Sequence, residues 1–279
     1  MEGRLKRLRK ALHRTTNMRN MSKVCFGIDG CKNGWVAARL EDNHLYIEFY
    51  ENILKFVQAN PNADEYLIDM AIGFPSCKEQ VRPDKAARKI LGKKGVTVFP
   101  VPCRQVVEIG TSKESVIQNR EELKELNRKK LGVSLTQQTL AIIPKMAELD
   151  RFLQEHPEYR DRICESHPEV CFARLNGNKA IEIKKSRSKG VSKRTEVLEK
   201  YLEPGALSDI KALAKKGNCK PDDVLDAVCL AVTAKFNGEG KCECIHGDVK
   251  PEEYGRLVDN KGLRMQMVVP AVDVSKNTK

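Results

Sequence analysis

Five acidic residues stand where the sequence pattern ends a strand or runs along a helix: Asp29, Asp69, Glu165, Asp223 and Asp226. The first two end apolar runs, Glu165 lies in a strand expected around 163–169, and the last two are three positions apart, so they share one face of a helix. Ligands of open α/β sheets gather at the ends of strands. Asp69 and Asp226 are embedded in apolar sequence, where an unpaired carboxylate is costly. We therefore expect these side chains to converge on one site.

Carboxylates that share a site raise one another's pKa, and a bound divalent cation relieves their repulsion. Ligands that are all oxygen favour Mg²⁺ or Mn²⁺ over zinc. Two such ions could activate a water molecule and stabilise the leaving oxygen of a phosphodiester. We predict that Asp29, Asp69 and Asp226 ligate the metal, and that Asp223 and Glu165 complete the catalytic set.

Each of these residues also has an ordinary structural explanation. Asp29 precedes Gly30 and suits a turn. Asp223 suits the positive end of a helix, and Glu165 suits the protein surface. Gly27 and Gly30 would allow the backbone to approach closely near the site.

Three further residues are candidates for substrate binding. Lys32 and Arg88 could contact phosphate, and His167 could add a ligand or carry a proton. Because His167 precedes Pro168, its backbone is expected to be extended. The alternatives are a histidine held in structural hydrogen bonds and an arginine on a solvated helix face.

The hydrophobic pattern predicts the strands and helices that must position these residues. Residues 24–29, 35–40 and 45–50 are expected to form three strands joined by short turns, as an antiparallel meander. The strand at 66–69 is reached through a helix at 52–59, so it should run parallel to the first strand. Such a pairing would bring the ends of the first and fourth strands together.

The rest of the chain is expected to be mainly helical. A strand is expected in 162–170 (RICESHPEV), and Pro221 opens a strong final helix. The other expected elements are a basic helix at 82–91, an extended piece at 96–101, a charged helical stretch at 113–130, a long helix at 136–154 kinked by Pro144, a basic loop at 184–194, short helices at 193–201 and 208–215, and a last edge strand at 263–269. The pattern predicts one α/β domain at 23–270, with a helical insertion, between a basic tail at 1–22 and a polar tail at 271–279.

The charge of the chain is strongly positive and concentrated at its start. The formal net charge is +12, and residues 1–23 hold eight lysines and arginines against one glutamate. A basic surface attracts phosphate backbones, so a nucleic acid is the expected partner. A solvated tail explains the basic segment equally well. So does an upstream start codon, since Met18 and Met21 stand just before the first strand.

The ten cysteines are scattered, and several lie inside apolar strands or helices. This is typical of reduced, buried thiols and favours a cytoplasmic location. Cys242, Cys244 and His246 have no evident fourth partner, so we expect no zinc site there. No apolar run approaches the roughly 18 residues that span a bilayer, and no membrane association is expected.

Four segments of the sequence resemble those of a known family. They are GIDGCKNGWVAA (27–38), IDMAIGFP (68–75), ESHPEVCFARLNG (165–177) and DDVLDAVCLAVTA (222–234). In this order they resemble the DUF429 family, which is described as predicted ribonuclease H-like nucleases. The segment at 87–102 (ARKILGKKGVTVFPVP) is similar to the middle of that family. The resemblance implies a ribonuclease H-like fold.

The first and last segments also resemble those of Holliday-junction resolvases. In that family a strand-one aspartate and a D-x-x-D-A helix hold metal ions, and Asp29, Asp223 and Asp226 match this pattern. The fourth-strand ligand of the resolvases is glutamate, whereas the matching position here is Asp69. The shorter side chain would draw the metal closer to the strand or leave room for a water molecule.

The leading hypothesis is therefore a nuclease that uses Mg²⁺ or Mn²⁺ to cut DNA or RNA. One alternative is a phosphotransferase of the actin-like branch of the fold, for which the DGCKNG loop is suggestive. That class needs a second, duplicated half and an adenosine-binding G-G pattern, and the sequence shows neither. Another alternative is a non-catalytic nucleic-acid-binding protein. Such a protein would have lost its acids, and aromatic residues that stack on single strands are sparse here, at 5%.

Overall fold

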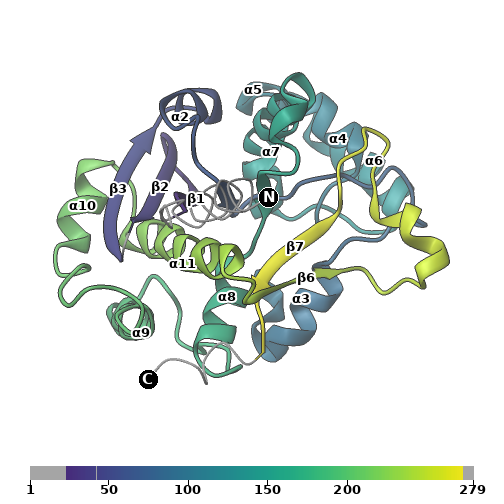
Figure 1. Cartoon of the computed structure of the whole chain (residues 1–279). Helices are drawn as coiled ribbons and strands as arrows, with labels where there is room; N and C mark the ends of the chain where they lie inside the picture. Colours follow the sequence, from purple (N-terminus) through teal and green to yellow (C-terminus); the bar gives the residue numbers. More distant parts are fainter. Residues whose placement is uncertain (1–22, 42, 273–279) are drawn as a thin grey trace, which may run out of the picture.

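The computed structural model describes residues 23–41 and 43–272, and a mixed five-stranded sheet forms its centre (Figure 1). Its strands are β1 (Cys25–Cys31), β2 (Gly34–Glu41), β3 (His44–Tyr50), β4 (Glu65–Ile68) and β5 (Ile163–Glu165). They lie in the order β3-β2-β1-β4-β5. β1, β2 and β3 form an antiparallel meander, whereas β4 pairs in parallel with both β1 and β5. The predicted ribonuclease H-like sheet is confirmed.

The central strand β1 is buried on both faces, which explains its nearly continuous apolar sequence. Successive side chains of a strand point to opposite faces. Phe26 and Ile28 belong to one hydrophobic cluster, while Cys25 belongs to another on the opposite face. Gly27 and Asp29 share the face of Cys25.

Helices cover both faces of the sheet. They are α2 (Ile53–Ala59), α3 (Asp84–Leu91), α4 (Arg104–Ile109), α5 (Lys113–Gln118), α6 (Arg120–Leu131), α7 (Gln137–Glu155), α8 (Pro168–Leu175), α9 (Ser188–Leu198), α10 (Ile210–Lys216) and α11 (Pro221–Gly238), with short 3₁₀ helices η1 (Gly92–Thr97), η2 (Pro157–Tyr159) and η3 (Pro251–Leu257). Helix α11 packs against β1, β2 and β4, and α8, α9 and α10 pack against α11. Helices α2 and α7 supply apolar side chains to the cluster on the other face.

The expected final helix is α11, which begins with Pro221 at its first turn. Asp222 and Asp223 also lie in that turn, where acids interact favourably with the helix dipole. Almost every later residue of α11 is buried. A helix that is buried nearly all round is a core helix, so α11 fixes its side chains firmly against the sheet.

The expected helical insertion lies between β4 and β5 and contains α3 to α7. Helices α4, α5, α6 and α7 enclose a third, smaller hydrophobic cluster. As predicted, Pro144 lies inside the longest of them, α7.

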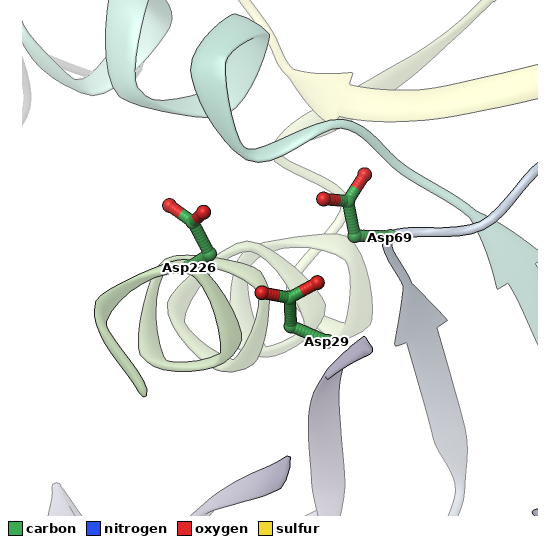
Figure 2. Close-up of side chains that lie close together, drawn as sticks. All are labelled: Asp29, Asp69 and Asp226. Atoms are coloured by element: carbon green, nitrogen blue, oxygen red, sulfur yellow. The ribbon is translucent and has the colours of Figure 1, made fainter. Parts of the chain in front are cut away.

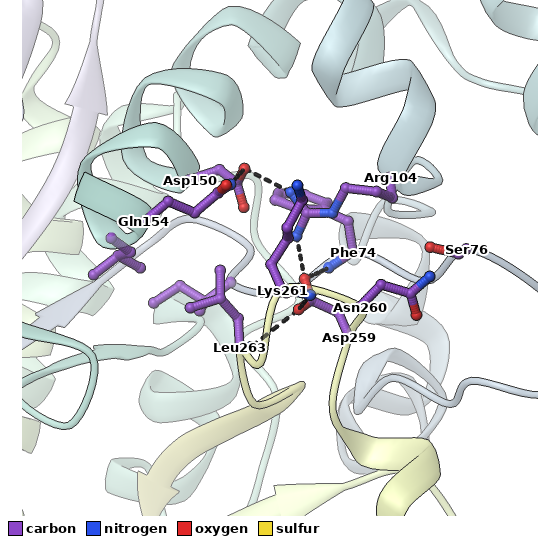
Figure 3. A network of polar contacts seen from close by, with 12 residues as sticks. Phe74, Ser76, Arg104, Asp150, Gln154, Asp259, Asn260, Lys261 and Leu263 are labelled. Carbon is purple, nitrogen blue, oxygen red and sulfur yellow. Dashed lines mark hydrogen bonds and ion pairs between the residues drawn. The ribbon is translucent and has the colours of Figure 1, made fainter. Parts of the chain in front are cut away.

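A buried ionic network fastens the insertion to the C-terminal part of the chain (Figure 3). Arg104 of α4 donates to Oδ2 of Asp150 in α7 at 2.6 Å and also contacts Asp259. The same oxygen of Asp259 accepts from the backbone N–H of Phe74 at 2.9 Å, and its other oxygen accepts from that of Leu263 at 2.9 Å. Two carboxylates thus share one buried guanidinium.

Residues 242–270 add a separate two-stranded sheet of β6 (Cys242–His246) and β7 (Gln266–Pro270). The strand expected at 263–269 therefore pairs with β6 and is not an edge of the main sheet. The sequence did not predict β6 as the partner of this strand, because the residues of β6 are half-buried or exposed and show no apolar pattern.

The strand expected within 162–170 is β5, and it ends at Glu165 because Pro168 occupies the first turn of α8, where proline is favoured. Two other local expectations were wrong. The extended piece expected at 96–101 begins inside η1. The basic loop expected at 184–194 is largely helix α9, and its Arg194 is fully buried in an ion pair with Glu169.

Within the described residues, no helix combines the length and the apolar character that crossing a bilayer requires. The basic tail expected at 1–22 and most of the polar tail expected at 271–279 lie outside the described residues.

Candidate metal centre

Three of the predicted acids converge in one place (Figure 2). Asp29 comes from β1, Asp69 directly follows β4, and Asp226 comes from α11. One oxygen of each carboxylate lies within 4.8 Å of the others. Among the described residues, this is the group of acids, histidines or cysteines with a geometry that could hold a metal ion. We call it the aspartate cluster.

The pairing of β1 with β4 brings the first two members together. Ile28 is the register partner of Ile68, so the residues that follow them are neighbours at the carboxyl ends of two parallel strands. The backbone N–H of Asp69 donates to the carbonyl of Ile28 at 2.8 Å and continues the ladder. The sequence prediction that Asp29 and Asp69 come close is confirmed.

A close contact between β1 and α11 brings Asp226, the third member of the aspartate cluster, beside the other two. A Cβ atom at Gly27 would lie 2.1 Å from the carbonyl oxygen of Ala227 and 2.1 Å from the backbone nitrogen of Ala231. Glycine alone lets the helix backbone lie directly on the strand. Because Asp29 lies two residues along the same face of β1, this contact sets Asp226 opposite it.

Burial and mutual repulsion disfavour negative charge in the aspartate cluster. Burial raises the pKa of Asp29 well above its usual range, and the charges of Asp69 and Asp226 raise it further. Burial raises the pKa of Asp226 to about 7, although Lys185 opposes the rise. Burial also raises the pKa of Asp69, against the charges of His167 and Lys185. A divalent cation would relieve this repulsion.

The oxygens of the cluster fit a hard divalent cation. Oδ1 of Asp226 is buried and has no hydrogen-bond partner among the described residues. Oδ1 of Asp29 accepts from the adjacent N–H of Gly30, at 2.7 Å. Buried carboxylate oxygens of this kind are ligands that a hard metal ion takes in proteins.

Lys185 is a member of the site that the sequence analysis missed. Its ammonium donates to Oδ2 of Asp226 at 2.5 Å. Burial lowers the pKa of Lys185, but the charges of Asp226 and Asp29 outweigh burial and raise it. The residue lies in a basic stretch, KKSRSKG, where nothing in the sequence separates one lysine from its neighbours.

The structure does not bring Glu165 and Asp223 into the aspartate cluster. Glu165 uses both oxygens elsewhere: one accepts from Arg82 at 2.6 Å and the other from the N–H of Ile72 at 2.7 Å. Burial raises the pKa of Glu165 to about 7, and the attraction of Arg82 opposes that rise. Asp223 accepts from the N–H of Lys220 at 2.9 Å and caps the start of α11. Both acids therefore have structural partners.

The three expected substrate-binding residues lie in different environments. Lys32 is exposed and lines the cleft above the cluster. His167 lines the same cleft, with an extended backbone as predicted, and its Nδ1 is buried without a partner among the described residues. Arg88 does not line the cleft. Its guanidinium donates twice to the carbonyl of Val98, at 3.1 and 2.8 Å, and so holds η1 against α3.

The aspartate cluster lies in a cleft of about 700 Å³ that is lined by the strand ends, the helical insertion, the start of α8 and residues 184–186. Six lysines line this cleft: Lys32, Lys94, Lys113, Lys145, Lys184 and Lys185. Lys145 is already engaged, because its ammonium donates to the carbonyl of Gly34 at 2.6 Å and lies 4.4 Å from the centre of the Trp35 ring. Asp84, Glu165 and Glu169 also line the cleft, but each is paired with an arginine. The lysines would therefore suit a substrate with a negatively charged backbone.

Comparison with known proteins identifies the family without giving an activity. No curated protein matches the chain, and no solved structure matches it either. One family model matches residues 27–251, which include all three members of the aspartate cluster. The chain therefore belongs to the DUF429 family, whose description is a protein of unknown function.

Proposed function

We propose that this protein is a divalent-metal-dependent nuclease that hydrolyses phosphodiester bonds in DNA or RNA. The observation that carries the proposal is the aspartate cluster at the base of a lysine-lined cleft. Metal-binding acids alone would fit many hydrolases. Their combination with cationic walls selects a polyanionic substrate.

The three aspartates would hold the metal ion that hydrolysis needs. Asp29, Asp69 and Asp226 would hold Mg²⁺ or Mn²⁺, which when bound supplies an activated water and neutralises charge on the phosphate. The protein fixes these three carboxylates by a parallel strand pair and a core helix, so their positions are set before the substrate arrives.

The cleft walls would bind and orient the nucleic acid. Lys32, Lys94 and Lys113 line the cleft from three different segments, so a backbone lying between them would contact cations on more than one side. His167 lies beside the cluster with one ring nitrogen unpaired among the described residues, which suits a group that passes a proton or contacts a phosphate oxygen. Each phosphate contact of this kind contributes to affinity without reading sequence.

The test is a cleavage screen over single-stranded, duplex, hybrid and junction substrates with Mg²⁺, Mn²⁺ or Ca²⁺. The wild-type protein should cut at least one substrate with Mg²⁺ or Mn²⁺ and not with Ca²⁺, whose looser coordination misplaces the water. Asp29→Asn and Asp226→Asn should each lose roughly three orders of magnitude in rate, because each removes a metal ligand. Binding of the same substrate should be largely retained.

The matched control is Asp161→Asn, the same chemical change at a side chain that is 83% exposed. This variant should cut as fast as the wild type. Absence of cleavage on all substrates, or equal cleavage by Asp29→Asn, would reject the nuclease assignment and favour a binding protein or a phosphotransferase.

A further inference from the structure

The side chain of Lys185 enters the aspartate cluster from a loop on the surface. The residue lies between α8 and α9, and its side chain is 39% exposed, whereas that of Asp226 is 1% exposed. The ammonium reaches inward to Oδ2 of Asp226 at 2.5 Å. A partly exposed side chain on a surface loop therefore ends in a charge that contacts a buried acid.

The ammonium acts on the whole cluster, not on one acid alone. Its charge opposes the effect of burial at Asp29, at Asp69 and at Asp226. It nevertheless offers one positive charge to three carboxylates. Oδ1 of Asp226 stays buried and unpartnered among the described residues beside it. The cluster is thus only partly neutralised by the protein's own cation.

We propose that Lys185 is a tethered cation, which occupies the aspartate cluster in the metal-free protein and which a divalent ion must displace from Asp226. The inference rests on the metal site of the proposed function and adds a competitor for that site. Because ammonium and metal compete for the same carboxylate oxygens, the apparent metal affinity is lowered by the stability of the Lys185–Asp226 pair.

Displacement would give Lys185 a second role. The cleft around it also contains Lys184 and Ser186 and is open to solvent on that side. An ammonium that leaves Asp226 stays within the cleft, where a phosphate would be its natural partner. The cation that stabilises the metal-free site thereby becomes available to the substrate only after the metal has bound.

Neighbouring lysines do not share this geometry. Lys145 is held by the carbonyl of Gly34 and by the Trp35 ring. Lys184 lines the same cleft but is exposed, and no side-chain partner is found for it among the described residues. Lys184 is therefore the matched control: an adjacent lysine in the same cleft without the pair to Asp226.

The experiment is a titration of the full chain with Mn²⁺, followed by electron paramagnetic resonance of the free ion. Lys185→Met should bind Mn²⁺ roughly tenfold more tightly than wild type, which corresponds to about 1.4 kcal/mol. Lys185→Gln should show the same gain, and Lys185→Arg, which keeps the charge, should bind no more tightly than wild type. Lys184→Met should leave the affinity unchanged. In an Asp226→Asn background, Lys185→Met should give a clearly smaller gain, because the pair is already broken and only the charge felt by Asp29 and Asp69 is removed.

Thermal unfolding of each metal-free variant checks that it is folded. Equal or weaker binding by both Lys185→Met and Lys185→Gln would overturn the tethered cation, provided that wild-type binding depends on Asp29. If wild-type binding survives Asp29→Asn, or if neither wild type nor Lys185→Met binds Mn²⁺, the metal site itself fails. The two failures are therefore distinguishable.

Discussion

The oxygens of Asp226 and Glu165 meet different partners, although both residues are buried acids beside one cleft. One oxygen of Asp226 is unpartnered among the described residues, whereas both oxygens of Glu165 are taken by Arg82 and by a backbone N–H. The sequence predicts both as site acids, because Asp226 is embedded in apolar sequence and Glu165 lies in an expected strand. It could not separate them, since Arg82 is 83 residues from Glu165 along the chain.

Glu165→Gln should therefore act on stability and not on metal binding. Breaking a buried ion pair from one side leaves Arg82 without its counter-charge, and the free energy of unfolding should fall by roughly 3 kcal/mol. Its Mn²⁺ affinity should stay at the wild-type value. Asp29→Asn should behave in the opposite way, losing the metal while keeping most of the stability. Urea unfolding and Mn²⁺ titration of the two variants measure both quantities. If folded Glu165→Gln loses Mn²⁺ affinity, Glu165 is a metal ligand and this prediction is wrong.

The raised pKa of Asp226, at about 7, predicts how stability depends on pH without metal. An unfolded aspartate has a pKa of about 3.9. Between these values the folded chain retains a proton that the unfolded chain has lost. The free energy of unfolding should therefore fall as pH rises through this window, by up to about 1.4 kcal/mol per pH unit for one fully linked group.

Urea unfolding in a chelator between pH 4.5 and 7.5 tests this dependence. Asp226→Asn should flatten it, and saturating Mn²⁺ should reverse it because metal binding requires the charged carboxylates. The same slope in wild type and Asp226→Asn would show that Asp226 is already ionised in the folded protein.

Strand β1 and helix α11 are the secondary-structure elements that position the aspartate cluster. The sequence predicts both of them. The apolar run predicts β1, and Pro221 with its following acids predicts the start of α11. The predicted close approach at Gly27 is also confirmed. The sequence could not show that α9 begins at Ser188, because the buried Arg194 looks like a solvated charge until Glu169 is known to face it.

Gly27→Ala should damage the fold and the site together. The new methyl group would overlap the backbone of α11, so the helix must move away from β1 and carry Asp226 with it. Overpacking of this kind should cost about 3 kcal/mol or more, and the Mn²⁺ affinity of the folded fraction should fall. Gly255→Ala is the control, because a Cβ atom there would meet nothing within 4 Å. Wild-type stability in Gly27→Ala would mean that strand and helix are not in backbone contact.

The overall fold includes contacts between segments that are far apart in the sequence, and a local sequence pattern does not predict all of them. The order of the five strands could be predicted, because short strands joined by short turns and one crossover leave few arrangements. The pairing of β6 with β7 could not, since β6 has no apolar alternation. Nor could the network around Arg104, whose two acids lie 46 and 155 residues away in the chain.

Asp259→Ala tests whether this network holds the insertion in place. The change removes one of two carboxylates from a buried guanidinium and leaves the N–H groups of Phe74 and Leu263 unpaired. The free energy of unfolding should fall by about 3–5 kcal/mol. Asp161→Ala, which removes an exposed carboxylate, should change stability little. A small effect at both positions would show that the network does not contribute to the free energy of unfolding.

A crystal structure of the protein soaked in Mn²⁺, with anomalous scattering used to locate the ion, tests the aspartate cluster as a metal centre. We expect an anomalous peak bounded by carboxylate oxygens of Asp29, Asp69 and Asp226, with Lys185 withdrawn from Asp226. A difference map without a peak there, or with Mn²⁺ bound only elsewhere and Lys185 still paired to Asp226, would contradict the assignment of this cluster as a metal centre.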